Sequence, residues 1–289
     1  MKFLFSVLLA VCVSHASFLK AKSAFPARGF AKILNDKEAK DRLDNYRAFW
    51  TRDLNSSGFH QGYAFRFRFR HMPRRGKEFF RTGTIYGLAI GHSLSRLDLD
   101  SVSGNKSNIN YLFQSSNKPK VWFCSKNNDS KLLSNKELFD PIIDGMNHSP
   151  FDILMPFIFW ESKYLKSGKV AGRPSHIYSF SSPEWVNQIH SDFNRVTLAL
   201  DASYQAPLKV ETFAKLGVPR KTLILNSLKK ISDQWIVKSI DCKNNLSRSN
   251  TRFEVLSVAL NLDLDEAIFT PHGILERPVI SNDLFVSTM

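Results

Sequence analysis

The segment from Tyr63 to Arg70 constrains the fold most, because two kinds of side chain alternate along it. Aromatic rings occupy every second position and arginines three of the positions between them, and a period of two is the spacing of a β-strand. A strand here places the rings on one face of a sheet and the guanidinium groups on the other. The rings belong to Tyr63, Phe65, Phe67 and Phe69, and the arginines are Arg66, Arg68 and Arg70.

Apolar stretches bounded by turn residues predict that strands make up most of the remaining chain. One amphipathic helix precedes them, beginning at Asn35, apolar at Ala39, Leu43, Tyr46 and Trp50, and ending within residues 55–58. Strands are predicted over residues 79–88, 92–99, 110–114 and 120–124, then over 170–180, 195–201, 208–213, 221–228, 235–242 and 251–260. This order predicts a mainly β fold with α-helices: one large curved antiparallel sheet, an incomplete barrel, with helices on its concave face.

Residues 138–160 interrupt the strands with a helical insert. Leu138, Phe139, Ile142, Ile143 and Met146 recur at helical spacing, and a second helix is expected to begin with Ser149 as N-cap and Pro150 in its first turn. The second helix is apolar nearly all round and should be kinked at Pro156. Such a helix must be buried on several sides, so we interpret the insert as a lid over the concave face. Ser162 and residues 167–168 are its candidate hinges.

The first sixteen residues have the composition of an export signal. Lys2 is their only charge, an apolar stretch follows, and Ser14-His15-Ala16 offers the small residues that a signal peptidase requires. The apolar stretch is about half the ~20 residues that a membrane-spanning helix needs. We therefore expect a signal peptide over residues 1–16, export to the periplasm and one domain over residues 17–289. Membrane attachment as a lipoprotein through Cys12 is the alternative.

Cys124 and Cys242 remain after cleavage, and two cysteines carry no spacing pattern. In an oxidising compartment they can form a disulfide, and they can equally be small buried hydrophobic residues. The sequence leaves both alternatives open.

No motif for catalysis, metal binding or a cofactor is recognisable. The chain has no nucleophile elbow, zinc-protease helix, phosphate-binding loop or CxxC pair, and its histidines are scattered singly. His176 lies near Arg173 without a carboxylate or nucleophile nearby in sequence. We therefore predict a protein that is not an enzyme and needs neither metal nor cofactor; an exported hydrolase is the distant alternative.

The net charge of +14 raises the question of polyanionic partners. Single-strand nucleic-acid platforms need rings and cations on one face, whereas strict alternation separates them, so nucleic acid is not expected. The arginine face is either an ordinary solvated surface or a surface for anionic lipid headgroups. The ring face is either packed core or the wall of a cavity, and the surplus of apolar surface on strands and insert would suit a cavity for lipid.

Several segments resemble the outer-membrane lipoprotein-sorting proteins of the LolA-like superfamily, in order and spacing, across residues 66–269. They are Gly83-Thr84-Ile85-Tyr86-Gly87, Pro156-Phe157-Ile158-Phe159-Trp160 with Tyr164, Val170-Ala171-Gly172-Arg173-Pro174, Val196-Thr197-Leu198-Ala199-Leu200-Asp201 with Tyr204, Pro207-Leu208-Lys209 with Glu211, Trp235, Thr251-Arg252-Phe253, Asn261 and Phe269. The resemblance implies an unclosed sheet lidded by helices, with a cavity that holds acyl chains in the carrier members, in the periplasm and without metal or chemistry.

Together these observations predict a periplasmic, non-enzymatic carrier or binder of lipid or lipoprotein acyl chains, acting in outer-membrane lipoprotein sorting. The alternative is an envelope interaction protein, a sensor or assembly factor, that uses the same fold without lipid transfer. The expected partners are acyl chains and envelope membrane proteins, and the expected state is a monomer. The candidate cavity residues are Phe65, Phe67, Phe69, Ile85, Phe139, Ile143, Leu154, Phe157 and Trp160.

Overall fold

The computed structural model describes residues 31–50, 62–89, 93–101, 109–125, 129–214, 217–232 and 234–289. The predicted signal peptide over residues 1–16, the alternative anchor at Cys12 and the predicted helix end at residues 55–58 lie outside the described residues. Cleavage after Ala16 stays a prediction.

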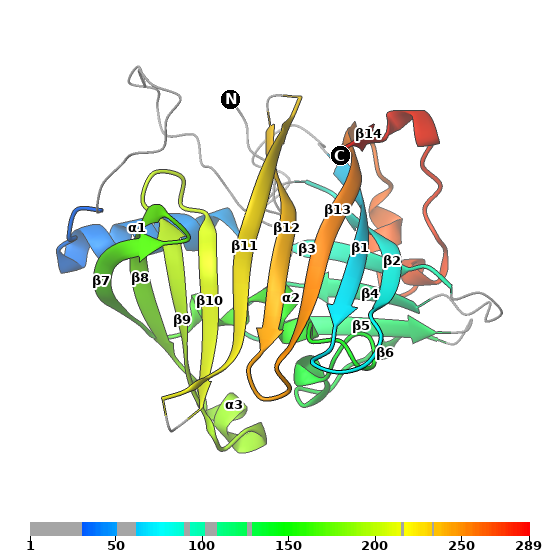
Figure 1. The fold of residues 1–289 in the computed structure, drawn as a ribbon. Coiled ribbons are helices and arrows are strands. Elements are labelled where there is room, and N and C mark those ends of the chain that lie inside the picture. Colours follow the sequence, from blue (N-terminus) through cyan, green and yellow to red (C-terminus); the bar gives the residue numbers. More distant parts are fainter. Residues whose placement is uncertain are drawn as a thin grey trace.

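Within the described residues, fourteen strands form one antiparallel sheet (Figure 1). They are β1 (Gly62–Met72), β2 (Phe79–Gly87), β3 (Leu94–Leu99), β4 (Ile109–Gln114), β5 (Lys120–Ser125), β6 (Lys131–Leu132), β7 (Ser162–Val170), β8 (Arg173–Ser181), β9 (Phe193–Asp201), β10 (Pro207–Ala214), β11 (Pro219–Ile231), β12 (Gln234–Asn244), β13 (Ser249–Leu262) and β14 (Val286–Ser287). Their order is β6-β5-β4-β3-β2-β1-β13-β12-β11-β10-β9-β8-β7, with β14 added to the side of β13. The two ends of this order are not joined, so the predicted incomplete barrel is confirmed.

The helix predicted from Asn35 is α1 (Asp36–Phe49). The Asn35 side chain accepts a hydrogen bond from the Glu38 backbone, and the Glu38 side chain accepts one from the Asn35 backbone, which is a capping box. Ala39 and Leu43 are buried on the face turned to the sheet, and the Tyr178 hydroxyl of β8 donates to the Ala39 carbonyl at 3.1 Å. This helix therefore packs on the concave face beside β7 and β8, as predicted.

The central strand β1 shows why one face of the sheet is apolar. Its rings enter the concave interior, whereas its arginines stand on the convex face. Phe67 lies opposite Gly83 of β2, and a Cβ on Gly83 would approach the Phe67 Cζ atom to 2.7 Å. The ring thus occupies the space that a side chain at position 83 would take. The predicted separation of rings and guanidinium groups is confirmed.

The predicted helix over residues 138–146 is wrong. Only a 3-10 turn, η2 (Glu137–Phe139), forms there, and turns follow it. Pro141 holds the preceding Asp140 in an extended conformation with ψ 149°, and Gly145 adopts φ +79°. The apolar residues at helical spacing are nevertheless buried, because the turns fold them against the same core.

The second half of the insert begins as predicted and then breaks. Ser149 caps α2 (Pro150–Leu154), with Asp152 completing a capping box. Met155 then adopts a left-handed conformation with φ 46°, and Pro156 opens the 3-10 helix η3 (Pro156–Phe159). Pro156 therefore starts a new element, where the sequence predicted a kink in one helix.

The strand predicted over residues 170–180 is only the second half of a hairpin. Ala171 and Gly172, both with positive φ, turn the chain between β7 and β8. The proposed hinges at Ser162 and residues 167–168 are wrong, since they lie within β7. This edge strand is mostly polar and none of its residues is buried, so it shows no apolar alternation that would reveal it. The short helix α3 (Glu184–Ile189) was also not predicted.

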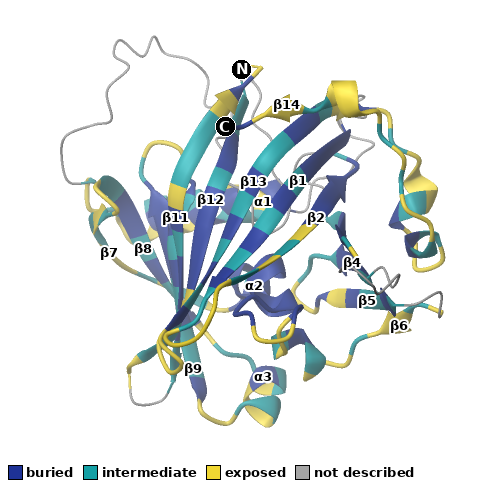
Figure 2. Cartoon of the chain, turned by 45° about the vertical axis from the view of Figure 1, so that its right-hand side comes forward, coloured by how far each residue is buried: buried dark blue, intermediate teal, exposed yellow. Residues whose placement is uncertain are grey.

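The C-terminal strap, which we define as residues 263–289, packs on the convex face and was not predicted. It contains η4 (Glu266–Phe269), η5 (Gly273–Leu275), η6 (Asn282–Leu284) and β14, and lies beyond β2 in Figure 1. Phe269 and Ile274 of the strap join Tyr86, Leu112 and Cys124 in a second, smaller core. The sheet is therefore apolar on both faces in this region, as Figure 2 shows by the burial of β2 and β4.

Candidate functional site

The concave face carries one large apolar cluster that contains all the candidate cavity residues. Eight of them have exposed fractions of 0 to 8%, and the ninth, Phe139, is half-buried against the same cluster. They come from β1, β2 and the insert, which are distant in sequence. The members in question are Phe65, Phe67, Phe69, Ile85, Phe139, Ile143, Leu154, Phe157 and Trp160.

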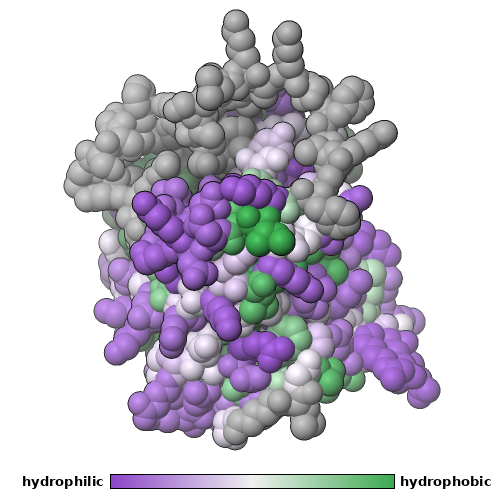
Figure 3. All heavy atoms as spheres, turned by 90° about the vertical axis from the view of Figure 1, so that its left-hand side faces the viewer, coloured by the Kyte–Doolittle hydropathy of each residue, from purple (hydrophilic) through white to green (hydrophobic). Residues whose placement is uncertain are grey.

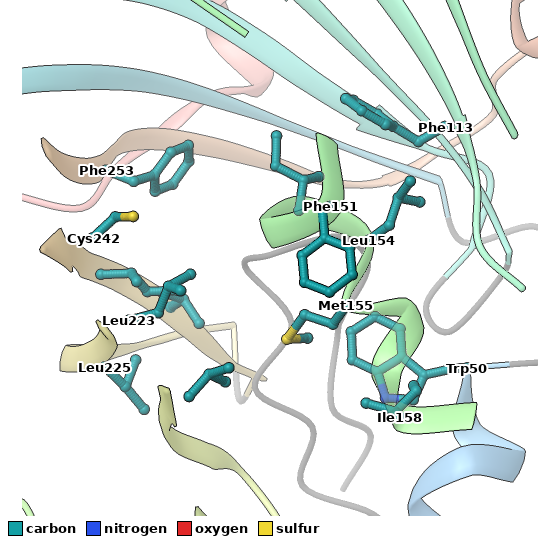
Figure 4. Packing of buried hydrophobic residues seen from close by; sticks show 14 of the residues in the cluster. Trp50, Phe113, Phe151, Leu154, Met155, Ile158, Leu223, Leu225, Cys242 and Phe253 are labelled. Atoms are coloured by element: carbon teal, nitrogen blue, oxygen red, sulfur yellow. The ribbon is translucent and has the colours of Figure 1, made fainter. Parts of the chain in front are cut away.

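The insert lies inside the curve of the sheet, and its side chains point in several directions. Figure 4 shows Phe151, Leu154 and Met155 between Phe113 on one side and Leu223 with Phe253 on the other. All five residues of α2 are buried. Burial on several sides was the prediction for a segment that is apolar nearly all round, and it is confirmed.

The rings within this interior touch one another. Phe67 stacks on Phe253 with ring centroids 5.0 Å apart, and both meet Phe69 edge-on at 5.0 and 5.2 Å. In the insert, Phe157 meets Phe180 of β8 at 5.6 Å. The contact between Phe157 and Phe180 joins the insert to the sheet, so side chains of the insert occupy the closed interior of the concavity.

A buried polar cluster attaches the start of the insert to β12 and β13. The Asn147 backbone N–H donates to Thr251 Oγ1 at 3.0 Å, and its side-chain amide donates to the carbonyls of Cys242 at 2.8 Å and Ser249 at 3.2 Å. The Ser249 hydroxyl donates in return to Asn147 Oδ1 at 3.0 Å. Nearly every hydrogen-bonding group of Asn147 is therefore satisfied. These hydrogen bonds fix the position of the insert relative to β12 and β13.

The same end of the insert holds a buried ion pair. Lys221 of β11 approaches Asp152 of α2 to 2.6 Å, and Asp152 also caps its own helix through Ser149. Burial lowers the pKa of Lys221, but the attraction of Asp152 outweighs it, so this pKa lies above its ordinary value. Lys221 is therefore charged and paired.

Arg47 of α1 attaches the other end of the insert. Its Nε donates to the Ile158 carbonyl at 2.6 Å, and one terminal nitrogen donates to the Trp160 carbonyl at 2.8 Å. These carbonyls end η3, where helical partners are lacking. A single guanidinium thus satisfies two of the orphan acceptors and joins α1 to the insert.

Three polar side chains are buried in this interior without a hydrogen-bond partner among the described residues. They are His148, at both ring nitrogens, and the indole N–H groups of Trp50 and Trp160. His148 packs on the Phe69 ring with centroids 4.9 Å apart. Buried polar groups without partners are costly and uncommon, so the closed interior is not an optimally satisfied core.

We expect replacement of His148 by leucine to flatten the acid side of the stability profile. Burial lowers the pKa of His148 to about 3, below the ~6.5 of an unfolded histidine, so the unfolded chain binds the extra proton. Neutral His148 therefore favours the folded state fully above pH 6.5, and this part of the free energy of unfolding is lost as the pH falls towards 3. The loss is about 2 kcal/mol between pH 7 and pH 5. Urea unfolding at both pH values measures this loss. His148→Leu should reduce the difference in unfolding free energy between pH 7 and pH 5, and exposed His272→Leu should not. The same difference in wild type and both variants would contradict the lowered pKa of His148.

A groove between α1 and β7 leads to the edge of the apolar interior. Its volume is about 410 Å³, and Ala39, Leu43 and Tyr178 on its wall belong to the large apolar cluster. Lys163 stands exposed on its rim. Figure 3 shows this side of the molecule, where apolar patches lie among hydrophilic side chains. A smaller pocket of about 250 Å³ lies beside Phe139 and Lys221 at the opposite end of the insert.

His176 and Ser167 lie close together but are not arranged as a base and a nucleophile. His176 Nδ1 lies 3.2 Å from Ser167 Oγ, but this hydroxyl donates to the Lys32 carbonyl at 2.6 Å. Burial lowers the pKa of His176 to about 4, which makes it a weak base. Arg173, which the sequence analysis placed near His176, forms its ion pair with Asp201.

Three further findings concern the described residues only. Among the residues that the structure describes, no group of three or more histidine, cysteine, aspartate or glutamate side chains could hold a metal ion. None of the helices they form is long and apolar enough to span a membrane. Cys124 and Cys242 are buried in separate cores without a disulfide between them, which decides the alternative that the sequence left open.

Sequence comparisons carry little information on function. A family described as an uncharacterized protein matches residues 160–275, which is less than half of the chain. A search among curated proteins found no match.

Structure comparisons identify the architecture. A Vibrio parahaemolyticus domain assigned provisionally to outer membrane lipoprotein sorting is 16% identical, with a TM-score of 0.66 over 83% of this chain and 100% of the other. A DUF1329 family protein from Desulfovibrio piger is 14% identical, with a TM-score of 0.64 over 83% and 98%. A LolA superfamily protein from Nitrosomonas europaea is 16% identical, with a TM-score of 0.57 over 80% and 97%. The open antiparallel sheet with helices in its concavity is therefore the fold of these structures, one of which is a LolA superfamily protein.

Proposed function

We propose that the protein is a periplasmic, non-enzymatic carrier or binder of lipid or lipoprotein acyl chains in outer-membrane lipoprotein sorting. The supporting observation is the position of the insert: a separate segment, whose helix α2 is wholly buried, lies in the concavity of an open sheet and places the candidate residues in one apolar cluster. The fold, shared with a domain assigned provisionally to lipoprotein sorting, agrees with this proposal. We further propose that the protein acts as a monomer and meets envelope membrane proteins.

The energy of binding comes from the methylene groups of the chain. Each buried methylene contributes about 0.8 kcal/mol, so ten of them contribute roughly 8 kcal/mol, from which the cost of exposing the displaced insert to water is subtracted. The aromatic and aliphatic side chains that now contact the insert would contact the acyl chain in its place. Binding therefore exchanges one apolar contact for another, and the cargo can be released.

The attachments of the insert suit a cover that opens. The end at Arg47 is held by hydrogen bonds to two carbonyls, and water can replace the guanidinium there. The buried indole N–H groups of Trp50 and Trp160 have no hydrogen-bond partner within the part of the chain that the structure describes and would find acceptors in the ester carbonyls of a lipid. The groove between α1 and β7 gives such a lipid its route, with Lys163 on the rim for an anionic headgroup.

Arg47→Gln tests the opening. Removing the guanidinium leaves the Ile158 and Trp160 carbonyls without this donor, so we expect lower stability, by about 1–3 kcal/mol, and faster uptake of a fluorescent fatty acid in stopped-flow mixing. Arg42→Gln is the matched control: it removes the same charge from the same helix, but Arg42 donates to the Ala202 carbonyl and does not contact the insert through this bond. Uptake that is equally fast in wild type, variant and control would contradict a lid attached at Arg47.

An envelope interaction protein with a permanently filled interior is the second candidate. The packing of the insert favours it, since Phe157 contacts Phe180 of β8 and every residue of α2 is buried. The fatty-acid experiment separates the two functions. Saturable binding supports the carrier, and no binding by wild type or Arg47→Gln supports the interaction protein.

A further inference from the structure

A second pocket lies on the convex face, away from the acyl-chain interior. It has a volume of about 450 Å³ and is formed where residues 277–285 of the C-terminal strap pass over β1 and β2. Arg66, Thr82 and Thr84 line its floor, and Arg277 with Asp100 lines one side. Its position on the opposite face of the sheet makes it independent of the proposed function.

Arg66 differs from the other arginines of its strand in its charge balance. Arg68 pairs with Glu254 at 2.7 Å, and Arg70 pairs with Glu78 at 2.8 Å. Arg66 contacts only neutral groups among the described residues: it donates to Asn282 Oδ1 and lies 3.7 Å from the Phe285 ring centroid. The half-buried guanidinium therefore has no counter-ion there, although a carboxylate neutralises each of its neighbours on the same face.

The surroundings of Arg66 favour an anion further. Thr84 lies directly opposite Arg66 across the β1–β2 pair, so the hydroxyl and the guanidinium face the same space. Arg277 and Asp100 neutralise each other in an ion pair, which leaves the pocket with one net positive charge from Arg66. A guanidinium beside hydroxyl donors matches the several acceptor oxygens of a phosphate group.

Tyr86 also lines the pocket, and its hydroxyl is hydrogen-bonded to Thr84 and Arg277. The rest of the wall is apolar. Leu256 of β13 and Pro278, Ile280 and Phe285 of the strap complete the pocket. A free inorganic anion would leave this surface without a partner, whereas an anion carrying a small apolar group would cover it. The pocket is thus amphipathic, with the charge on the β1–β2 floor and the apolar surface on the strap.

We propose that this pocket binds a phosphate monoester that carries an apolar group, with Arg66 as the charged ligand and Thr84 as hydroxyl donor. Both a lipid phosphate and a soluble phosphate ester have this chemistry. Because the strap forms the roof, ligand binding holds the strap on β1 and β2.

Amide chemical shifts of ¹⁵N-labelled full-length protein test the site without a mutation. Three probes are titrated separately: inorganic phosphate, phenyl phosphate, and dioctanoyl phosphatidic acid below its micellar concentration. We expect saturable shifts at Thr82, Thr84 and residues 277–280 with phenyl phosphate, at least tenfold tighter than with inorganic phosphate. If phosphatidic acid shifts these same amides, the ligand is a lipid phosphate. If only phenyl phosphate shifts them, the ligand is a soluble phosphate ester. If no probe moves these amides, the proposal is overturned.

Arg66→Gln then tests the charged ligand, with exposed Arg74→Gln as the matched control for net charge. Loss of one charge-assisted contact should weaken phenyl phosphate binding about tenfold or more in the first variant and leave it unchanged in the second. Equal weakening in both would show a diffuse effect of net charge and overturn the assignment. If Arg66→Gln does not fold, the shift titration of the wild type decides alone. Fatty-acid binding in the interior should be the same in both variants, so failure of this site and failure of the proposed function are distinguishable.

Discussion

Phe67→Glu should prevent cooperative folding of the protein. The Phe67 side chain is fully buried between Phe69 and Phe253 and occupies the space left open by Gly83. A carboxylate there has neither water nor a cation, and the cost of several kcal/mol is comparable with the whole stability of a typical domain, about 5–15 kcal/mol. We expect loss of the circular-dichroism melting transition together with loss of fatty-acid binding.

Phe80→Glu on β2 is the matched control for this substitution. Phe80 is exposed, and the guanidinium groups of Arg68 and Arg70 lie 5.4 and 6.0 Å from its ring centroid, so a carboxylate would meet cations. This control should fold and bind fatty acid as the wild type does. Retention of a normal melt by Phe67→Glu with loss of binding would instead show that Phe67 faces a hydrated cavity, contrary to the packing in the closed state.

Arg96→Met should release the C-terminal strap and cost about 3–5 kcal/mol. Arg96 is fully buried and pairs with Asp98 at 2.7 Å. Its remaining donors reach four strap carbonyls, those of Ile268, Gly273, Ile274 and Glu276. Methionine fills a similar volume but leaves the Asp98 carboxylate and these carbonyls without their partner. A buried charge without its partner is strongly destabilising.

Urea unfolding and limited proteolysis measure the two parts of this effect. The variant should unfold at lower urea and be cleaved within residues 263–289 before the sheet is degraded. Arg74→Met, at an exposed position in the β1–β2 turn, should change neither result. Strap protection equal to that of the wild type would show that the apolar contacts of Phe269 and Ile274 suffice to hold it.

The sheet was predictable because its strongest strand repeats one simple pattern. Strict alternation in β1 fixes which residues face the interior, and the Asn35 and Ser149 caps fix where two helices begin. Each signal depends on neighbours within a few residues. The structure confirms these signals, but not the helical spacing of residues 138–146, where Pro141 and Gly145 prevent a helix.

The features missed by the sequence analysis depend on contacts that are distant in the chain. Arg96 alternates with Leu97 as an exposed strand residue would, and only the strap, more than 170 residues later, buries it. The edge strand β7 is polar because it has one neighbouring strand and an exposed surface. The available sequence signal for a covered second face was the group of apolar residues Ile268, Phe269 and Ile274 after the last predicted strand.

The candidate cavity residues were located correctly as a group, but their role stays a prediction. Residues from β1, β2 and the insert meet in one cluster, as a curved sheet over an apolar insert requires. Apolar pattern cannot say whether such a surface is covered by protein or by lipid, because both present the same methylene and ring groups. The polar attachments at Asn147 and Arg47 had no local signal, since their partners lie on other elements.

Native mass spectrometry of full-length protein, isolated from the periplasm without detergent, tests the acyl-chain proposal most directly. The account predicts a species heavier than the polypeptide by the mass of a lipid, which dissociates under collisional activation and is identified by fragmentation of its acyl chains. Arg47→Gln, with a weakened cover, should release this lipid at lower collision energy than Arg42→Gln. A single species at the polypeptide mass, from fresh periplasm and after incubation with lipid vesicles, would contradict acyl-chain binding.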